Sequence, residues 1–366
     1  MKSKEKKKKL IRNIIITLVL LILTVGGYVT YMILSYSRIP DRQYLDIQTV
    51  GDYSKLSEAP ALDTSSYYEI MTYNIGFGAY TPEYDFFADG GKGSWALSEE
   101  SVMADICEIS NVINYSAPDF VFLQEVDVDG TRSYHVDELT LLNQFLYGYY
   151  YDFAVNYDSK FICYPLYQPH GKNRSGIATY SCINISEAVR RQLPVTDGHI
   201  SRLWDLDRCY TLSKVPLDNG KSLCLYNVHL SAYGSDASVR QAQLELLFND
   251  MKNEYKMGNY IICGGDFNHN LRGGDDTDVP GWAAPFPMEM IPTGFYLPLQ
   301  RILDSPNVAH DTCRNADQPY DEETSFTVTV DGFIVSENII VNYYTNANWG
   351  YAYSDHDPVL MQVMFR

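Results

Sequence analysis

The feature that most constrains this chain is a run of 21 residues without a charged side chain, from Ile14 to Leu34. As an α-helix, such a run is about 31 Å long, which matches the ~30 Å of hydrocarbon in a bilayer. Seven lysines and arginines but only one acid precede it within the first twelve residues, a bias typical of a cytoplasmic N-terminus. We therefore predict a basic cytoplasmic tail over residues 1–12, a single-pass anchor over residues 13–35 and a location in the cell membrane, with the rest of the chain outside.

Two alternatives to an uncleaved anchor remain for this run: a cleaved signal peptide and a buried core helix. A signal peptide has a shorter apolar core and small residues at its cleavage site. Here the Gly26-Gly27 pair is followed by Tyr28, Tyr31 and Met32, which offer no such site. No second apolar run of this length occurs, so the sequence favours a chain that crosses the membrane once.

The charge of the chain is unevenly distributed. In total, 28 basic residues face 46 acidic ones, a net charge of -18. The basic tail contributes +6, which leaves 21 basic and 45 acidic residues, or -24, in the remainder. An acidic body argues against a broad basic face that coats nucleic acid regardless of sequence. Hydrophobic residues at 46% and charged residues at 20% are globular values and exclude wholesale disorder.

After the apolar run, the sequence predicts a linker and then one α/β domain. Residues 36–66 are polar, contain Pro40 and Pro60 and show no sustained periodicity, which is typical of a linker. From residue 67 to residue 366, short apolar runs alternate with amphipathic segments. The predicted strands are residues 67–75, 120–126, 222–230, 259–267, 325–335 and 356–365, and the predicted helices are residues 99–115, 136–147 and 237–256. Ser98 is placed to cap the first of these helices.

Each of these apolar strands carries polar residues at or near one end. They are Asn74, Glu125, His229, Asp266 with Asn268, Asp331, and Asp355 with His356. In α/β folds, ligands gather at strand ends, because loops there project polar groups from a rigid scaffold. The set contains carboxylates, histidines and amides without a nucleophilic serine or cysteine, which suits a divalent metal and a phosphate.

The residue types in this set suggest a reaction. Carboxylates such as Glu125 and Asp355 are hard oxygen ligands that suit Mg²⁺, with Mn²⁺ or Ca²⁺ as alternatives. Attack of water on phosphorus needs a base, which Asp266 or a pair of Asp331 with a histidine would supply. His229 is the candidate proton donor to the departing alkoxide. The structural alternatives are turns at the Gly-Gly-Asp and Asp-Gly strings and a buried histidine that closes a strand.

The strings LQEVD, NVHL, GGDFNHN, DGFIVS and YSDHDPV occur in this order along the chain. Together they resemble the endonuclease/exonuclease/phosphatase superfamily, which includes deoxyribonuclease I, exonuclease III and the neutral sphingomyelinases. The resemblance runs from about residue 67 to residue 366. It implies a four-layer α/β sandwich, with two mixed β-sheets face to face and helices outside, and a metal-dependent hydrolase of phosphoester bonds. We therefore expect residues 67–366 to form the catalytic domain.

The resemblance also implies roles for individual residues. The implied metal ligands are Asn74, Glu125 and Asp355, with Glu125 as the main one. The implied catalytic residues are His229, Asp266, Asn268, Asp331 and His356. Among them, Asp266 and Asn268 resemble the pair that activates water and holds phosphate, and Asp331 and His356 resemble the family's hydrogen-bonded Asp–His pair.

One departure from the family pattern and three further residues bear on the substrate. Many apurinic-site nucleases of the family carry an acid where this chain has Gly76, which makes a repair nuclease a poorer match. Arg132, His170 and Arg174 are candidates for gripping a phosphate, with a surface salt bridge as the alternative for the arginines.

We therefore predict a membrane-anchored, metal-dependent phosphodiesterase. The alternatives are an extracellular endonuclease similar to deoxyribonuclease and a non-catalytic surface module that binds without cleaving. The substrate is a lipid headgroup, a nucleic acid or a small phosphodiester, and the apolar segment over residues 282–296 either touches lipid or packs. The membrane is the partner of the N-terminal helix, and no protein partner can be inferred.

Overall fold

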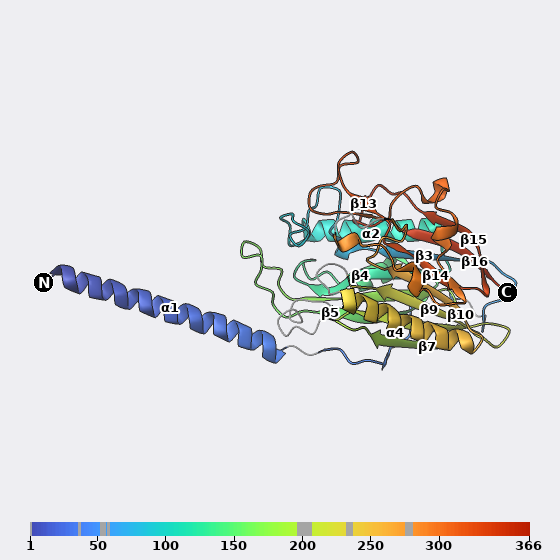
Figure 1. The fold of residues 1–366 in the computed structure, drawn as a ribbon, viewed down its shortest axis with the longest axis horizontal. Helices are drawn as coiled ribbons and strands as arrows, with labels where there is room; N and C mark the ends of the chain where they lie inside the picture. The colour runs from blue at the N-terminus through green and yellow to red at the C-terminus, as the bar shows by residue number, and fades with distance from the viewer. Residues whose placement is uncertain are drawn as a thin grey trace.

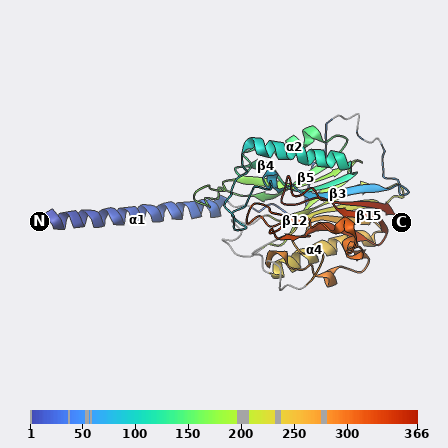
Figure 2. The same ribbon diagram turned by 90° about the horizontal axis from the view of Figure 1, so that it is seen from above.

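The computed structural model describes residues 2–35, 38–51, 56, 59–195, 207–231, 237–274 and 281–366. Two mixed sheets of seven strands each lie face to face, and helices cover their outer faces (Figure 1). Seen from above, α2 (Glu99–Ser116) and α4 (Ala237–Lys256) lie on opposite sides of the strands (Figure 2). The predicted four-layer α/β sandwich is thereby confirmed.

The first sheet has the strand order β1-β7-β8-β9-β10-β14-β11. Its strands are β1 (Gln43–Tyr44), β7 (Glu187–Gln192), β8 (Cys209–Pro216), β9 (Ser222–His229), β10 (Tyr260–Asp266), β11 (Phe295–Tyr296) and β14 (Asp331–Ser336). The pair β9–β10 is parallel and the other pairs are antiparallel. Outside this sheet, β12 (Cys313–Arg314) pairs with β13 (Thr327–Val328).

The second sheet has the strand order β15-β16-β3-β4-β6-β5-β2. Its strands are β2 (Gln48–Thr49), β3 (Tyr68–Asn74), β4 (Phe120–Gly130), β5 (Tyr150–Asp158), β6 (Asn173–Ser181), β15 (Ile339–Asn346) and β16 (Val359–Phe365). The pair β3–β4 is parallel and the other pairs are antiparallel. Short 3₁₀ helices occur at Gly76–Gly78, Gly281–Ala283, Met288–Met290, Pro298–Arg301 and Pro306–Val308.

The period-two alternation of a strand divides the core into two layers around β4. Phe120 and Phe122 face the first sheet, where the ring of Phe122 lies 6.4 Å from that of Phe333. Val121 and Leu123 point the other way, into a cluster with the buried faces of α2 and α3 (Glu138–Phe145). On the far side of the first sheet, α4 buries four apolar residues, which are Leu244, Leu247, Phe248 and Met251.

All three predicted helices are present, and the Ser98 hydroxyl caps α2 by accepting a hydrogen bond from the Ser101 amide at 3.1 Å. One predicted strand is wrong in part: residues 325–335 divide into β13 and β14, which belong to different sheets. The apolar segment 282–296 packs, because the rings of Phe286 and Phe295 lie in the core. All seven cysteines are free, so the described fold relies on its core without disulfides.

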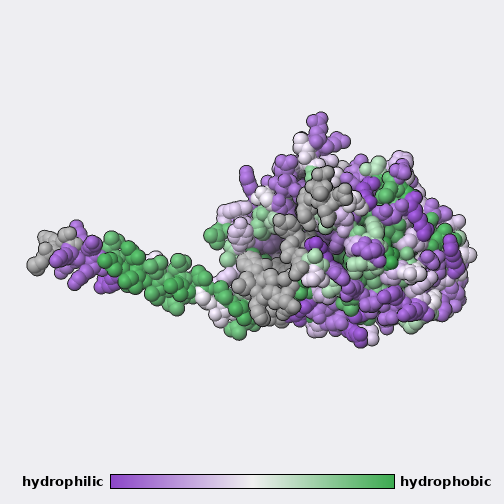
Figure 3. All heavy atoms as spheres, in the orientation of Figure 1, coloured by the Kyte–Doolittle hydropathy of each residue, from purple (hydrophilic) through white to green (hydrophobic). Residues whose placement is uncertain are grey.

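The N-terminal helix α1 (Lys2–Ser35) stands away from the sandwich (Figure 1). Among the described residues, one helix, Lys4–Ser35, is long and apolar enough to cross a membrane. Its apolar residues form a continuous exposed surface (Figure 3). The basic tail is helical too, so that α1 is longer than the predicted anchor.

Part of the segment expected to be a linker is bound to the sheets. Within residues 38–51, β1 pairs with β7 and β2 pairs with β5, so this segment supplies an edge strand to each sheet. Residues 36, 37, 52–55, 57 and 58 of the expected linker lie outside the described residues.

Candidate active site

The strand topology brings the predicted site residues to one end of both sheets. The parallel strands β9 and β10 end side by side, which pairs His229 with Asp266. Strand β14 runs antiparallel to β10 and begins at this end, which pairs Asp331 with Asp266. In the second sheet, β3 ends at Asn74, and β16 begins shortly after His356 and runs antiparallel to β3.

Glu125 reaches the same place through an irregularity in β4. The pairing of β4 with β6 shifts register between Leu123 and Val126, which marks a β-bulge. Glu125 lies in this bulge with a left-handed φ of 57°. A bulge redirects a side chain, and a left-handed backbone at a residue other than glycine is strained and found most often at functional sites. The bulge turns the carboxylate into the cavity described below.

Asn74 lies at the centre of the polar cluster. Its amide nitrogen Nδ2 donates to Asp266 Oδ2 at 3.1 Å and to Glu125 Oε1 at 3.4 Å, and it lies 3.4 Å from His356 Nε2. Its amide oxygen accepts a hydrogen bond from the Gly76 backbone at 3.1 Å. Asn74 therefore presents nitrogen to the carboxylates, and its role as a metal ligand stays a prediction.

His356 and Asp331 form the closest buried pair in the cluster. His356 Nδ1 lies 2.7 Å from Asp331 Oδ2, and the two residues are 6% and 1% exposed. Burial opposes a charge on the imidazole, but the Asp331 carboxylate outweighs it, and the pKa of His356 is raised well above its usual value. His356 is therefore protonated at neutral pH, and its Nε2 faces Asp266 at 3.9 Å.

Asp266 and His229 have pKa values that are shifted in opposite directions. Burial, together with the charge of Asp331, raises the pKa of Asp266 to about 7. Burial, together with the charge of Arg208, lowers the pKa of His229 well below its usual value. His229 Nε2 lies 3.6 Å from Asp266 Oδ2. A neutral imidazole thus lies beside a carboxyl group that exchanges protons near neutral pH, which suits general acid–base chemistry.

Asn268 holds Asp266 in place. Its backbone N–H donates to Asp266 Oδ1 at 2.8 Å, and its side-chain amide donates to the Leu230 carbonyl at 2.9 Å. The left-handed φ of 50° at Asn268 turns the chain out of β10 so that both hydrogen bonds can form. The structure places the residue in the cavity wall, next to Asp266.

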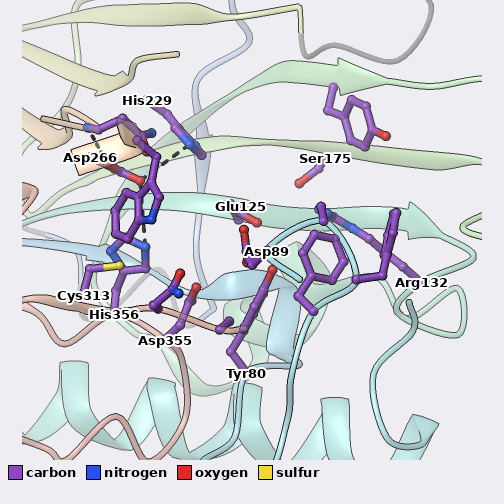
Figure 4. A pocket seen from close by; sticks show the side chains of 18 of the residues that line it. Tyr80, Asp89, Glu125, Arg132, Ser175, His229, Asp266, Cys313, Asp355 and His356 are labelled. Carbon is purple, nitrogen blue, oxygen red and sulfur yellow. Dashed lines mark hydrogen bonds and ion pairs between the residues drawn. The ribbon is translucent and has the colours of Figure 1, made fainter. Parts of the chain in front are cut away.

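The cluster lines a cavity of about 850 Å³ (Figure 4). The predicted site residues in its wall are Glu125, Arg132, His170, His229, Asp266, Asn268, Asp355 and His356. Asn74 and Asp331 lie behind this wall and hold it by the hydrogen bonds given above. Arg174 is exposed on β6 and is not part of the wall.

Arg132 and His170 line the cavity but already have partners in the protein. Arg132 forms a two-pronged ion pair with the buried carboxylate of Asp127, at 3.0 and 2.8 Å, and its guanidinium lies 3.8 Å above the ring of Phe77. His170 Nδ1 lies 3.0 Å from the Ser94 carbonyl, and burial lowers its pKa to about 4. Both residues therefore shape the wall opposite the cluster, and His170 is uncharged.

Several wall residues were missed from the sequence. Arg208 is 6% exposed, and its positive charge helps to lower the pKa of His229. Its sequence signal is topological: Arg208 precedes β8, and the start of β8 lies beside the end of β9 in the antiparallel pair. Tyr80, Asp89 and Cys313 also line the cavity (Figure 4).

The donor atoms in the cavity fit a divalent metal ion. Two groups of three side chains in the described part of the chain bring their ligand atoms within 4.8 Å of one another, and they are Cys313–Asp355–His356 and Asp266–Asp331–His356. Burial raises the pKa of Asp355, and the charge of Glu125 raises it further. Glu125 and Asp355 both line the cavity, and carboxylate oxygens are the donors that Mg²⁺ prefers.

The sequence also matches a known protein family over most of its length. Residues 71–356 match the Endonuclease/Exonuclease/phosphatase family. The chain belongs to this family. Members of the Endonuclease/Exonuclease/phosphatase family are metal-dependent hydrolases of phosphoester bonds, and the chain is an enzyme of this class. A comparison with curated protein sequences found no match.

Solved structures of the family share the fold at low sequence identity. The endonuclease/exonuclease/phosphatase from Beutenbergia cavernae is 17% identical, with a TM-score of 0.55 over 82% of this chain and 72% of that one. The human Nocturnin catalytic domain with bound sulfate is 17% identical, with a TM-score of 0.54 over 88% and 97%. D. rerio TDP2 complexed with a single-strand DNA product is 14% identical, with a TM-score of 0.53 over 81% and 99%. Identities this low bear on the fold alone.

Proposed function

We propose that the chain is a membrane-anchored phosphodiesterase that depends on a divalent metal, Mg²⁺ above all, and hydrolyses a P–O bond by attack of water. The observation that carries this proposal is the meeting of Glu125, His229, Asp266 and His356 in the wall of one cavity. These residues come from four separate strands or strand ends. A bulge orients Glu125, a backbone hydrogen bond orients Asp266, and Asp331 orients His356.

The membrane part of the proposal rests on α1. Its exposed apolar surface and the basic residues before it support residues 1–12 as a cytoplasmic tail and residues 13–35 as the anchor. The proposed location is the cell membrane, with residues 36–66 leading to a catalytic domain, residues 67–366, on the outer side. A membrane fraction that keeps the full chain after a carbonate wash would support an uncleaved anchor, and release into the supernatant would contradict it.

In the proposed site, Glu125 and Asp355 would hold the ion. When bound, a divalent cation neutralises charge on the phosphate and makes phosphorus easier to attack. Asn74 positions the carboxylates of Glu125 and Asp266 through its amide nitrogen. Its hydrogen bonds fix the position of Glu125, the proposed metal ligand, relative to Asp266, the proposed base.

Asp266, His356 and His229 supply the proton transfer and the charge stabilisation of the proposed reaction. Asp266, with a pKa raised to about 7, is the base that takes a proton from the attacking water. His356 is held protonated by Asp331 and places a positive charge beside the phosphate. His229 is neutral, and with its proton on Nε2 it would donate to the leaving group a hydrogen bond that strengthens as negative charge develops.

The test uses the full chain in detergent micelles with three substrates: plasmid DNA, sphingomyelin and bis(p-nitrophenyl) phosphate. We expect hydrolysis of a phosphodiester with Mg²⁺ or Mn²⁺, and loss of this activity with EDTA. Asp266→Ala and His229→Ala should each lower the rate at least about 100-fold. Glu289→Ala, which removes an exposed carboxylate outside the cavity, is the matched control. Unchanged rates in both site variants would refute the assigned mechanism, and metal binding without turnover would favour the non-catalytic alternative.

A further inference from the structure

One loop exposes large apolar side chains next to the cavity. In residues 159–171, Phe161 is 46% exposed, Tyr164 57%, Leu166 83% and Tyr167 69%. Single exposed apolar residues are ordinary on a protein surface, but four within seven residues form a patch. Patches of this kind mark surfaces that bind protein or membrane.

The loop is held in a defined shape, so its tip is presented outward. At its base, Ile162 and Gly171 exchange two backbone hydrogen bonds, at 2.8 and 3.0 Å. Trp95 Nε1 donates to the Pro169 carbonyl at 2.7 Å, and the Tyr167 hydroxyl donates to the Lys92 carbonyl at 2.6 Å. The bonds at Ile162 hold the loop before Leu166, and the bonds at Tyr167 and Pro169 hold it after Leu166, which itself remains exposed.

The loop contacts the N-terminal helix directly. The Tyr28 hydroxyl donates to the Phe161 carbonyl at 2.9 Å and accepts from the Cys163 amide at 3.3 Å. Tyr28 lies six residues before Leu34, about 9 Å along the helix from the outer end of the apolar run. Aromatic residues such as Tyr28 are enriched at the membrane–water interface. The loop therefore meets α1 inside the outer part of the apolar run, in the half that would lie in the outer leaflet.

The connection between helix and domain is too short to separate them. Helix α1 ends at Ser35, and Arg38 already forms an ion pair with Asp207 at 3.4 Å. Near the end of α1, Met32 is buried, whereas Leu34 is 79% exposed. One side of the C-terminal end of α1 thus packs against the domain. The domain would therefore lie directly against a membrane that α1 enters.

The charge of the loop differs from that of the rest of the chain. The loop, residues 159–171, contains one basic residue, Lys160, and no acid, in a chain with 46 acidic and 28 basic residues. Lys160 lies 3.6 Å from Asp158, which borders the loop, and the tip over residues 161–167 carries no charged side chain. The tip therefore presents aromatic and aliphatic side chains without the acidic charge that would repel the rest of the chain from an anionic membrane.

The same loop also forms part of the cavity wall. Ile162, Tyr164 and His170 line the cavity together with the catalytic candidates His229 and Asp266. Any surface that contacts the tip of the loop therefore also lies next to the candidate active site. A phosphoester in that surface is close enough to enter the cavity.

We propose that the loop at residues 159–171 inserts its tip into the outer leaflet that α1 crosses, and that the cavity takes the phosphodiester headgroup of a phospholipid in that leaflet. This inference rests on the proposed function for the anchor and for the site. It adds the substrate class and the surface that delivers the substrate: the bilayer occupies the patch, and the headgroup enters beside Tyr164.

Insertion is tested without reference to activity. The full chain is placed in nanodiscs of ordinary or brominated phosphatidylcholine, and tryptophan fluorescence is compared between the two. Leu166→Trp should show about twofold stronger quenching by brominated lipid than the unsubstituted chain. The matched control is Tyr343→Trp, at a residue 47% exposed on β15 at the opposite end of the molecule (Figure 1). Equal quenching for Leu166→Trp, Tyr343→Trp and the unsubstituted chain would overturn insertion, whether or not the enzyme is active.

The substrate class is tested with Leu166→Ser in proteoliposomes of phosphatidylcholine, phosphatidylglycerol and sphingomyelin. Loss of this side chain from the leaflet should lower the hydrolysis of lipid severalfold, by about fivefold to tenfold. Hydrolysis of soluble bis(p-nitrophenyl) phosphate should be unchanged, because Leu166 neither lines the cavity nor anchors the loop. Quenching at Leu166→Trp combined with cleavage of DNA or the soluble diester but of no lipid would overturn the substrate class. Inactivity on every substrate would instead refute the proposed function, and the quenching result would still decide the insertion.

Discussion

Substitution of Gly76 separates the geometry of the proposed metal site from the general stability of the fold. Gly76 has a φ of +52°, and a Cβ there would lie 2.7 Å from Tyr80 Cδ2, 3.0 Å from Asp355 Oδ1 and 3.0 Å from Ser354 Oγ. Gly76→Ala therefore costs about 1–2 kcal/mol for a left-handed alanine and in addition displaces Asp355. Displacing the supports of a metal ligand weakens metal affinity about 10- to 100-fold. We expect the Mg²⁺ concentration at half-maximal rate to rise by this factor.

The control for Gly76→Ala is Gly220→Ala. Gly220 has a φ of +78°, and a Cβ there would meet nothing within 4 Å, so that this variant carries the backbone cost without a collision. Both variants of the full chain are compared by thermal unfolding and by the rate on bis(p-nitrophenyl) phosphate during a Mg²⁺ titration. Both should lose stability through backbone strain, Gly76→Ala the more because of the collision, and only Gly76→Ala should need more Mg²⁺. The same Mg²⁺ dependence in both folded variants would refute the placement of Asp355 as a metal ligand.

Three further predictions follow from the site and the core. Arg208→Ala should lower kcat about 10²- to 10³-fold, because Arg208 lines the cavity near His229, while the exposed Arg174→Ala should not; equal rates for the two variants would contradict this role. Asp152→Asn should stabilise the fold by roughly 2–4 kcal/mol at pH 8 but not at pH 3. Burial raises the pKa of Asp152 from 3.8 to about 7, so the native protein loses stability as the pH rises through this range. A difference in unfolding free energy between the two proteins that does not depend on pH would rule this out. EDTA should abolish phosphodiester hydrolysis and added Mg²⁺ or Mn²⁺ should restore it, and full activity in EDTA would exclude the proposed chemistry.

The strands that were predicted from the sequence and the strands that were missed differ in the side chains that they bury between the two sheets. Strands β9 and β10 each contain an uninterrupted apolar run, LCLY and YIIC, and their bounds were predicted within two residues. Strands β5, β6 and β8 were missed, because they turn polar side chains inward. Thr179 and Thr211 share a hydrogen bond of 3.1 Å across the sheets, and Ser213 donates to Asp152 at 2.6 Å. Such inward-facing polar side chains remove the hydrophobic alternation on which strand prediction depends.

The site was predictable to the extent that strand ends determine it. Asp266 and His229 end neighbouring parallel strands, so their meeting follows from the order of the strands. Arg132 lines the cavity, but its guanidinium is bound by the buried carboxylate of Asp127. Arg208 could not be found, because its position depends on the undetected strand β8. Pairings between side chains far apart in sequence were thus beyond the reach of pattern analysis.

The distribution of charge connects the anchor, the loop and the choice of substrate. The chain beyond its basic tail carries a net charge of -24, and such a body is repelled by an anionic leaflet over most of its surface. The uncharged tip of the loop, residues 161–167, is an exception to this rule, and the loop contacts α1 through Tyr28. In the proposed arrangement, repulsion of the acidic body acts in the same direction as the anchor and favours a cavity that faces the membrane. A soluble polyanion such as DNA would then approach an acidic surface and a cavity whose mouth lies beside lipid. For this reason the headgroup of a membrane phospholipid fits the molecule better than nucleic acid does.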